Sequence, residues 1–532
     1  MAVLEEKTCP SGIAPVASSD RAAFEDVDFV PGTEYMGDSF RGHEQIQGNG
    51  KDHVTLVPQP SQDPHDPLNW SRLWKFVTIA TSMVYSFLGG WVSLSLNPFF
   101  ITLMTYFERS ANDIAWLTSS LLLILGFANI ITIPVAVCYG RRSAYLWSTL
   151  VTFASTLWAA SATSYTSFLW ARIVMGLGAA GIETLTPVTI VDACFLHERG
   201  LWNSIYFLAL FGGADLGGVV SGVIAGSTLG WHWFFWVTRR SILLGACSVA
   251  VIVLMPETAW ERVPTADIAE DQRVLGTGKP ARSAFSLLPK RVTGSISPMS
   301  ALLRPLPVFF APTVLYSSLM FGFFACMFLV ANVAQSSIFQ VNYGFSVTQT
   351  GLTNFAFLFG QLAGLPMSGW FSDWISMRAT KRNNMIREPE MRLVALVPTI
   401  ATAAVGLLLL GCTAEAKTHW MGPIMGLVVL GAGVTATCVI SVTYAIDCHK
   451  VLSGEVMLVA TILKNVLSFG FAQFTSSWIA SQHLRTPFLI LMGVALFLGI
   501  GPSMLMYFYG KRLRRFIAAK NLLPQGKGIL AE

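Results

Sequence analysis

Ionisable side chains inside long apolar segments are the clearest candidates for chemistry in this chain. Arg172 and Glu183 lie in one such segment, eleven positions apart. That spacing is close to three helical turns, so both side chains should project from nearly the same face of a helix. A charge inside a bilayer costs about 2.5–3.5 kcal/mol on insertion scales, so each one needs an explanation. Glu183 is a candidate proton carrier, whereas Arg172 either lines a pathway or snorkels to the membrane surface.

Three further apolar segments also carry charge. Asp215 falls near the middle of one, where it could carry a proton, bind a cationic substrate or pair with a buried arginine. Lys464 and Asn465 fall near the middle of another, and we interpret Lys464 as a cavity residue. Arg239 and Arg240 are adjacent, so they point roughly 100° apart on a helix. Either one of these two snorkels outward, or they form a positive lining that pairs with Asp215 or attracts an anionic substrate.

Several kinds of chemistry are not supported by the sequence. All eight histidines lie at or beyond the ends of the apolar segments, which contain no paired acids, nucleophile motif or metal-ligand cluster. The eight cysteines include no C-x-x-C pair, and no G-x-x-x-x-G-K-[ST] phosphate-binding motif is present. We therefore expect no enzyme activity, no cofactor and no metal site. The net charge of +5 comes from Lys and Arg scattered through short loops, so we expect no nucleic-acid partner.

The elements that must position these side chains are membrane-spanning helices. The 532 residues are 53% hydrophobic and only 12% charged, against roughly 25% charged in a soluble domain. A helix of about 20 apolar residues crosses a bilayer while satisfying its own backbone hydrogen bonds. Such stretches recur, so the sequence predicts an all-α polytopic membrane protein. Its twelve predicted spans are 74–97, 114–136, 144–162, 168–190, 202–226, 233–255, 307–332, 348–368, 394–412, 420–444, 455–479 and 486–509.

Positive charge predicts how these spans are oriented. The Lys and Arg residues that flank the spans fall almost entirely on one side, which is typical of the cytosolic side. Both termini are therefore expected in the cytosol, in agreement with an even number of spans. We expect a disordered cytosolic tail, a six-helix half, a cytosolic linker, a second six-helix half and a cytosolic tail, at residues 1–73, 74–256, 257–306, 307–510 and 511–532.

Related motifs occupy related places in the two halves, which indicates an internal repeat of six spans. Tyr139-Gly-Arg-Arg142 follows the second span, and Gly369-Trp-Phe-Ser-Asp373 with Arg378 follows the eighth. With further motifs in order, the chain resembles the major facilitator superfamily over about residues 63–510, and within it the fungal twelve-span drug/proton antiporter branch that includes multidrug and polyamine transporters. The further motifs are Asp66-Pro-Leu-Asn-Trp70, Arg172-Ile-Val-Met-Gly176, His197-Glu-Arg-Gly200, Gly230-Trp-His-Trp233, Pro256-Glu-Thr258, Arg382 to Arg392, Tyr444-Ala-Ile-Asp447 and Lys464-Asn465.

This resemblance implies two pseudo-symmetric six-helix halves, the major facilitator fold, and a role for Arg172 in proton transfer or substrate binding. It also implies that charges at the inner ends of the spans gate the pathway, namely Arg141, Arg142, Asp373 and Arg378. We interpret Asp447 and Glu455, at the inner ends of the tenth and eleventh spans, as gating charges, with a structural role as the alternative. Two positions depart from the family pattern. Val137 replaces an aspartate of the first gate, and Gly218 replaces a proline of the antiporter motif in the fifth span. Arg141 and Arg142 must therefore find other partners or only helix dipole ends.

Glycines recur every four residues in the fifth and eighth spans, where each set lines one helix face and permits close backbone approach. One reading is ordinary packing of membrane helices. The other, implied by the resemblance, is a sliding seam between the two halves. These glycines are Gly213, Gly217, Gly218, Gly222, Gly360 and Gly364.

The leading functional hypothesis is a secondary transporter that works by alternating access. It would export a drug-like, polyamine-like or secondary-metabolite substrate in exchange for protons, because Glu183 or Asp215 would bind either a proton or the substrate but not both. The alternative is an uptake symporter or a facilitator for a small nutrient, since fold does not fix function. The expected partners are a small-molecule substrate, protons and the lipid bilayer. We expect a monomer in the plasma membrane, with the vacuolar membrane as the alternative.

Overall fold

The computed structural model describes most of the two helical halves. The described residues are 32–35, 61, 63–94, 96–227, 234, 243–260, 278–286, 297–449, 452–482, 484–520 and 523. The predicted pair Arg239 and Arg240 lies outside them, as do most of the predicted first tail and the outer part of the predicted span 233–255.

Helices account for nearly all of the described first half. Its first three spans are α3 (Arg72–Leu94), α5 (Ala111–Cys138) and α6 (Arg141–Ser161). The fourth span is interrupted and consists of α7 (Tyr165–Ala179), η3 (Ala180–Ile182) and α8 (Leu185–Ala193). The fifth is α9 (Leu196–Ala225), and the described part of the sixth is α11 (Leu243–Leu254). Shorter helices are η1 (Pro67–Asn69), η2 (Asn97–Phe99) and α4 (Phe100–Phe107).

The second half repeats this plan. Its first span is α14 (Pro312–Gln335), which η6 (Ser336–Asn342) continues. The next is divided into α15 (Val347–Leu352), α16 (Asn354–Pro366), η7 (Met367–Phe371) and α17 (Ser372–Arg382). The others are α18 (Leu396–Glu415), α19 (Met421–Cys448), α20 (Ser453–Gln482) and α21 (Arg485–Ala519). Short connecting helices are η5 (Arg282–Phe285), α12 (Pro298–Leu303), α13 (Pro305–Phe309) and η8 (Pro389–Ala395).

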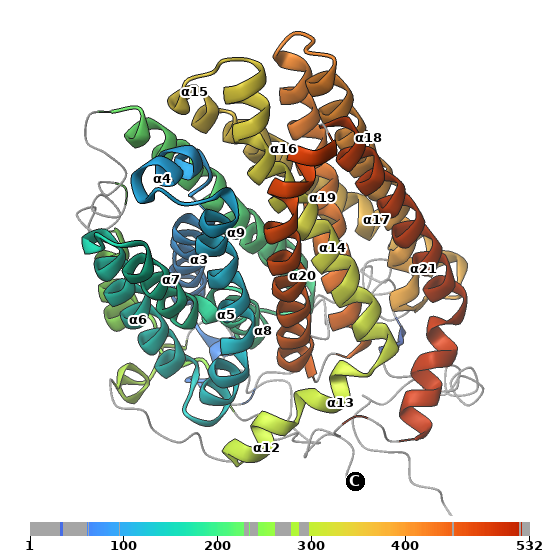
Figure 1. The fold of residues 1–532 in the computed structure, drawn as a ribbon. Helices are drawn as coiled ribbons and strands as arrows, with labels where there is room; N and C mark the ends of the chain where they lie inside the picture. The colour runs from blue at the N-terminus through green and yellow to red at the C-terminus, as the bar shows by residue number, and fades with distance from the viewer. Residues whose placement is uncertain are drawn as a thin grey trace, which may run out of the picture.

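The two halves stand side by side as separate bundles (Figure 1). Helices α3 to α9 form the blue-to-green bundle, and α14 to α21 form the yellow-to-red one. Across the boundary, α5 packs along α20, and α9 packs along α15 and α16. The predicted fold class, an all-α polytopic bundle of two six-helix halves, is confirmed.

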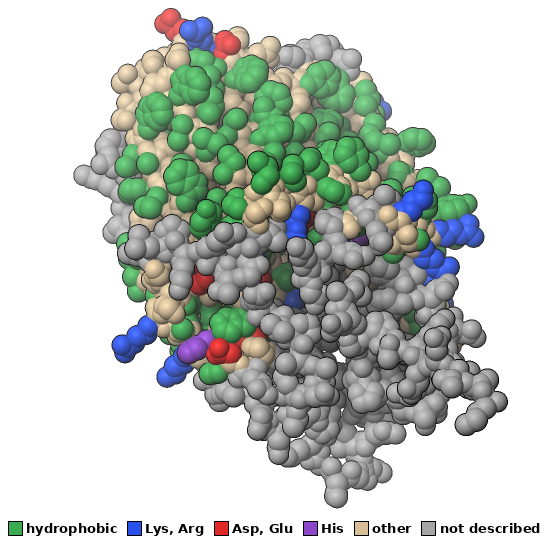
Figure 2. All heavy atoms as spheres, turned by 90° about the horizontal axis from the view of Figure 1, so that it is seen from below, with side chains coloured by type: hydrophobic (Ala, Val, Ile, Leu, Met, Phe, Trp, Pro, Cys, Tyr) green, Lys and Arg blue, Asp and Glu red, His purple; other side chains and the backbone are tan. Residues whose placement is uncertain are grey.

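Within the described residues, nine helical stretches are long and apolar enough to cross a membrane. The described residues of the other three predicted spans are also helical, and each of these spans fails the length or hydropathy criterion for a different reason. Helix α6 begins with two arginines and is rich in Ser and Thr, α11 is described only in part, and the eighth span is divided near Thr353 and again beyond Pro366. Figure 2 shows a broad area of hydrophobic side chains in the upper part of the view, with few charged side chains within it, as expected for a surface that faces lipid.

Two segments outside the spans are held on the inner side of the bundles. Strand β1 (Glu34–Tyr35), within the predicted tail, pairs antiparallel with β2 (Ile386–Arg387) of the second half. Residues of the linker pair with the Asp66–Trp70 motif of the first half, because Gly278 donates to Asn69 O at 3.0 Å and accepts from Ser71 N at 2.9 Å. The boundaries of the tails and linker stay predictions.

Candidate functional site

A buried ion pair joins the two halves. Glu183 follows η3 in the fourth span, and Lys464 and Asn465 lie on α20. Lys464 Nζ donates to Glu183 Oε1, and Asn465 Nδ2 donates to Glu183 Oε2 at 3.0 Å. The exposed fractions are 7% for Glu183, 6% for Lys464 and 0% for Asn465. A buried carboxylate is thus compensated by one cation and one amide from the opposite half.

The interruption of the fourth span positions Glu183. Where η3 ends, the backbone groups released from the helix take partners from neighbouring helices. Ser86 Oγ donates to Ile182 O at 2.9 Å, and Tyr206 Oη donates to Glu183 O at 3.0 Å. Thr184 Oγ1 donates to Asn129 Oδ1 at 2.7 Å. These two backbone contacts and one side-chain contact hold the turn from α3, α9 and α5, and the Glu183 carboxylate is directed toward α20.

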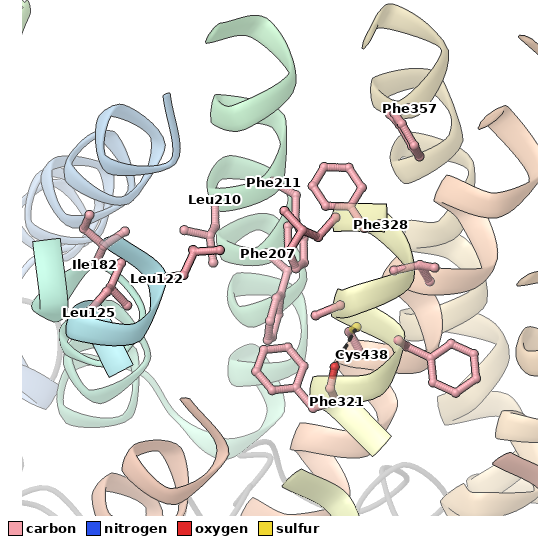
Figure 3. Close-up of a cluster of buried hydrophobic side chains, with 14 of the residues drawn as sticks. Leu122, Leu125, Ile182, Phe207, Leu210, Phe211, Phe321, Phe328, Phe357 and Cys438 are labelled. Carbon is pink, nitrogen blue, oxygen red and sulfur yellow. Dashed lines mark hydrogen bonds between the residues drawn. The ribbon is translucent and has the colours of Figure 1, made fainter. Parts of the chain in front are cut away.

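Aromatic side chains from both halves pack beside this ion pair. Lys464 Nζ lies 5.9 Å from the ring centroid of Phe321 on α14. The Phe321 ring lies 5.9 Å from that of Phe207 on α9, and the rings of Phe211 and Phe328 are 5.6 Å apart. Figure 3 shows these four rings between α9 and α14. The sequence analysis missed this layer, although the spacing of Phe207 and Phe211 places both on one face of α9.

Arg172 does not contact Glu183. Its guanidinium, fully buried, donates to Val92 O at 3.0 Å, Ser93 O at 2.8 Å and Leu117 O at 3.0 Å. Helix α3 ends at Leu94, so its last carbonyls have no donor within the helix. Arg172 supplies that donor and ties α7 to α3 and α5, while the irregular η3 turn separates it from Glu183. A regular helix through both residues, which the spacing argument assumed, is not present.

Asp215 makes a second contact across the boundary. It lies near the middle of α9 with an exposed fraction of 1%, and its Oδ2 accepts a hydrogen bond of 2.7 Å from Gln361 Nε2 on α16. Among the described residues, the partner is an amide rather than an arginine. A third contact of this kind joins α20 to α5, where Gln473 Nε2 donates to Ser119 Oγ at 2.7 Å.

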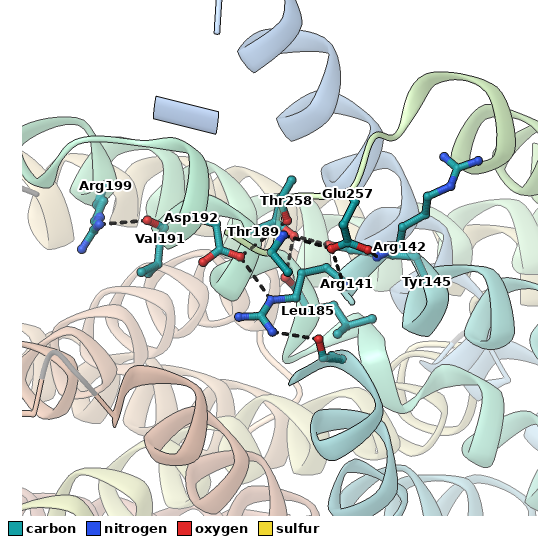
Figure 4. A network of polar contacts seen from close by, with 12 residues as sticks. Arg141, Arg142, Tyr145, Leu185, Thr189, Val191, Asp192, Arg199, Glu257 and Thr258 are labelled. Atoms are coloured by element: carbon teal, nitrogen blue, oxygen red, sulfur yellow. Dashed lines mark hydrogen bonds and ion pairs between the residues drawn. The ribbon is translucent and has the colours of Figure 1, made fainter. Parts of the chain in front are cut away.

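Partners for the first pair of predicted gating arginines, Arg141 and Arg142, come from within their own half and its linker (Figure 4). Arg141 Nε pairs with Asp192 Oδ2 at 3.1 Å. The backbone N–H groups of Arg141 and Arg142 donate to the Glu257 carboxylate at 2.7 and 3.1 Å, so Glu257 caps the start of α6. Burial raises the pKa of the Glu257 carboxyl. Gly140 precedes them with a φ of 93°, and an added Cβ there would lie 2.1 Å from Glu257 Oε2.

The side chain of Arg142 binds backbone oxygens. It donates to Ile252 O at 2.6 Å and Val251 O at 3.2 Å on α11, and to Phe285 O and Ser286 O at 3.1 Å in the linker. It therefore fixes the linker to the sixth span. Val137 removes the family's acid, and Asp192 serves Arg141 in its place.

A charge cluster of the second half borders a cavity of about 210 Å³ between the inner ends of the halves. Arg392 lies between Asp373 at 2.9 Å and Asp447 at 3.5 Å. Asn203 and Arg199 line the cavity from α9, so both halves contribute to its wall. This cavity lies at the end of the boundary that is predicted to face the cytosol.

The remaining predicted gating charges lie apart from that cavity. Arg378 stacks on the Trp374 ring at 5.4 Å, and Glu455 lies 4.0 Å from Arg304 of the linker. The sequence analysis also missed a buried pair, in which Arg514 Nε and Nη2 donate to the two Glu390 oxygens at 2.8 and 2.6 Å. A bidentate pair of this kind fastens α21 to η8.

The predicted glycines divide between two kinds of contact. On the boundary, an added Cβ at Gly222 would lie 2.6 Å from Gly351 Cα, and one at Gly218 would lie 2.8 Å from Asn354 Nδ2. Gly217 is buried on α9. The others pack inside their own half: an added Cβ would meet Phe87 O at Gly213, Val428 O at Gly360 and Ala432 O at Gly364.

Comparison with known proteins agrees with this architecture. The family model described as Major Facilitator Superfamily matches residues 79–472. The MFS transporter cpaT of Aspergillus oryzae is 28% identical over 493 residues, covering 89% of this chain and 95% of that protein. The efflux pump radE of Floropilus chiversii is 25% identical over 460 residues, covering 85% and 83%. The xylose transporter XylE from E. coli shares the fold, with a TM-score of 0.57 and 14% identity over 82% of this chain and 98% of that one.

Fold and comparisons together define a multi-pass α-helical membrane transporter rather than an enzyme. The chain belongs to the Major Facilitator Superfamily, and the resemblance drawn from its motifs is confirmed. Within the described part of the chain, no group of three or more His, Cys, Asp and Glu side chains could hold a metal ion.

Proposed function

We propose that this transporter exports a small organic solute by alternating access, driven by protons moving in the opposite direction. The observation that carries the proposal is the buried Glu183–Lys464 ion pair, which joins the two halves through side chains alone. A contact of this kind can be made and broken as the halves rock against each other. The substrate is a drug-like, polyamine-like or secondary-metabolite compound, in line with a relative named as an efflux pump.

Coupling follows from competition at this pair. Lys464 forms an ion pair with Glu183 only while the carboxylate is ionised and within reach, and Asn465 adds a hydrogen bond. A proton on Glu183, or a substrate group that takes the place of Lys464, removes the attraction between the halves. The conformation in which this pair joins the two halves then becomes less stable relative to the conformation in which the pair is broken.

The setting of the transporter follows from its charges. Arg141, Arg142 and Arg392 lie at one end of the spans, which we assign to the cytosol together with both termini. The protein acts as a monomer, because each chain of this fold has its own pair of halves. We assign it to the plasma membrane.

The experiment is transport by the purified chain in liposomes with an imposed pH gradient. The probes are labelled spermidine, a fluorescent aromatic cation, benzoate and a neutral steroid, each measured with and without the gradient. We expect gradient-driven flux of at least one probe, and at least tenfold lower flux in Glu183→Gln. Glu108→Gln, which changes an exposed acid in an outer loop, is the matched control. Flux that is the same with and without the pH gradient would overturn proton coupling and favour facilitated diffusion.

A further inference from the structure

The contact between Asp215 and Gln361 lies in one of the tightest parts of the boundary. Both side chains have an exposed fraction of 1%. On α9, Gly212 and Gly218 flank Asp215 by three residues on either side, and both face the opposite half. An added Cβ would lie 3.1 Å from Leu358 Cδ1 at Gly212 and 2.8 Å from Asn354 Nδ2 at Gly218. The close approach of α9 and α16 leaves little room for water beside the carboxyl group.

Among the described residues, the contact between Asp215 and Gln361 leaves two buried acceptor oxygens without a donor. Gln361 Nε2 donates to Asp215 Oδ2, but the other carboxyl oxygen, Oδ1, and the amide oxygen, Gln361 Oε1, have no partner among the described residues. Both of these atoms are acceptors, so no rearrangement of an ionised Asp215 can pair them. A proton on the carboxyl turns one of them into a donor. A carboxylic acid and a primary amide can then form two hydrogen bonds, after small rotations about their broad terminal torsions.

No opposite charge faces Asp215 from the described elements packed against it. Helices α15, α16, η2 and η7 contain no ionisable side chain. The ionisable groups of the other neighbours are at the inner ends of their helices or have partners elsewhere. These are Arg72, Lys75 and Tyr85 on α3; Asp192 on α8; Tyr316 and Cys326 on α14; Cys438, Tyr444, Asp447 and Cys448 on α19; Glu455 and Lys464 on α20; and His197, Glu198, Arg199 and Tyr206 on α9 itself.

The two buried acids of the boundary therefore differ in kind. Glu183 has a lysine and an asparagine donor, which stabilise its ionised form. Asp215 has a single neutral donor, which is far too little to replace the hydration of a buried charge. We propose that Asp215 is a second proton-binding acid of this transporter, beside Glu183, and that in the arrangement described here it is neutral and shares its proton with Gln361 across the boundary.

This assignment rests on the proposed function and adds a mechanism to it. Loss of the proton leaves a carboxylate that needs water or a cation, and the closed boundary offers neither. Ionised Asp215 therefore favours the arrangement in which α9 and α16 separate and water reaches the carboxylate. Protonation favours the contact with Gln361. Proton release from Asp215 is thereby linked to separation of α9 and α16, while the Glu183–Lys464 pair remains available for the substrate.

The test is infrared spectroscopy of the full-length chain in lipid at neutral pH, because the C=O stretch of a protonated carboxyl is separate from the amide bands and shifts in D₂O. We expect such a band, its loss in Asp215→Asn, and its retention in Glu183→Gln. In Gln361→Leu the band should remain but move to higher frequency, since the carbonyl loses its hydrogen bond. A band that survives in Asp215→Asn, or disappears only in Glu183→Gln, would overturn the assignment. Each variant is first checked for a monodisperse, folded state.

Failure of this assignment and failure of the proposed function give different results. If transport proves independent of protons while the infrared band belongs to Asp215, proton coupling is wrong, but the protonated contact between Asp215 and Gln361 is supported. If transport is proton-coupled but Asp215 is ionised, the coupling site lies elsewhere. In Asp215→Asn the amide pairs with Gln361 without a proton, so we expect flux that no longer responds to the pH gradient.

Discussion

Glu183 and Lys464 form a buried ion pair although 281 positions separate them in the chain. One belongs to the interrupted fourth span and the other to the middle of α20, so the pair exists only when the two halves are in place. A buried ion pair is costly to form from water but more costly to leave half-made. This asymmetry gives a direct test of the contact.

Removing one partner of this pair should destabilise the protein much more than removing both. Lys464→Met leaves the Glu183 carboxylate buried with only Asn465 as donor, and we expect a loss of about 3–5 kcal/mol in unfolding free energy. The double variant Glu183→Gln/Lys464→Met should recover most of it. Unfolding in detergent micelles, analysed as a double-mutant cycle, measures the difference. A double variant that is less stable than Lys464→Met would contradict the pairing.

The glycine contact between α9 and α15 should tolerate no added side chain. In Gly222→Ala the new Cβ would lie 2.6 Å from Gly351 Cα, so the two helices must move apart. We expect a loss of about 1–3 kcal/mol in stability, as for overpacking of a core. The matched control is Gly470→Ala on α20, where nothing lies within 4 Å of the added atom. Thermal unfolding of both variants in detergent decides the matter, and equal stability would argue against a tight seam.

The sequence predicted the elements better than it predicted their partners. Hydropathy located the spans because each helix satisfies its own backbone in lipid, whatever surrounds it. The pairing of Glu183 with Lys464 depends instead on how two halves pack, which no local pattern contains. Gln361 was overlooked because a single uncharged amide in an apolar span gives no signal until its neighbour is known to be Asp215.

Two local differences from the sequence predictions have physical causes. The helical spacing of Arg172 and Glu183 assumed a regular helix, but the η3 turn lies between them and each side chain finds different partners. The end of the last span was placed at residue 509, where charged residues begin, yet α21 continues to Ala519. It continues because Arg514 is buried against Glu390, a contact that its charge alone does not reveal.

The imidazole of His449 should make the protein sensitive to acid. It follows α19, its Nε2 lies 2.8 Å from Thr313 Oγ1, and burial lowers its pKa from 6.5 to about 4. The unfolded chain therefore binds a proton at a higher pH than the folded chain does, so stability falls as the pH drops from 6.5 toward 4 and levels off below that. A shift of this size corresponds to about 3 kcal/mol.

The measurement for His449 is the unfolding temperature in detergent across that pH range. His449→Gln keeps a hydrogen-bonding side chain without the titration, so its curve should be flatter than that of the parent. The matched control is His419→Gln, which changes an exposed histidine of the outer loop. A parent curve that does not fall would contradict the expected acid sensitivity, and a curve that falls equally in His449→Gln would assign that sensitivity to other groups.

Arg392 should hold together the second-half wall of the cavity between the inner ends of the halves, because its guanidinium lies between two acids on different helices of that half. Asp373 belongs to α17 and Asp447 to α19, at 2.9 and 3.5 Å. A lysine at this position carries the same charge but lacks the planar fork that reaches both acids. We therefore expect Arg392→Lys to open the cavity more often, by about tenfold, which corresponds to about 1.4 kcal/mol. The readout is the rate at which a thiol at position 203, introduced as Asn203→Cys in the cavity wall, reacts with a polar reagent in nanodiscs. Arg378→Lys is the control, since Arg378 stacks on Trp374. An equal increase in the thiol reaction rate in this variant would show that the effect is not specific to the contacts of Arg392.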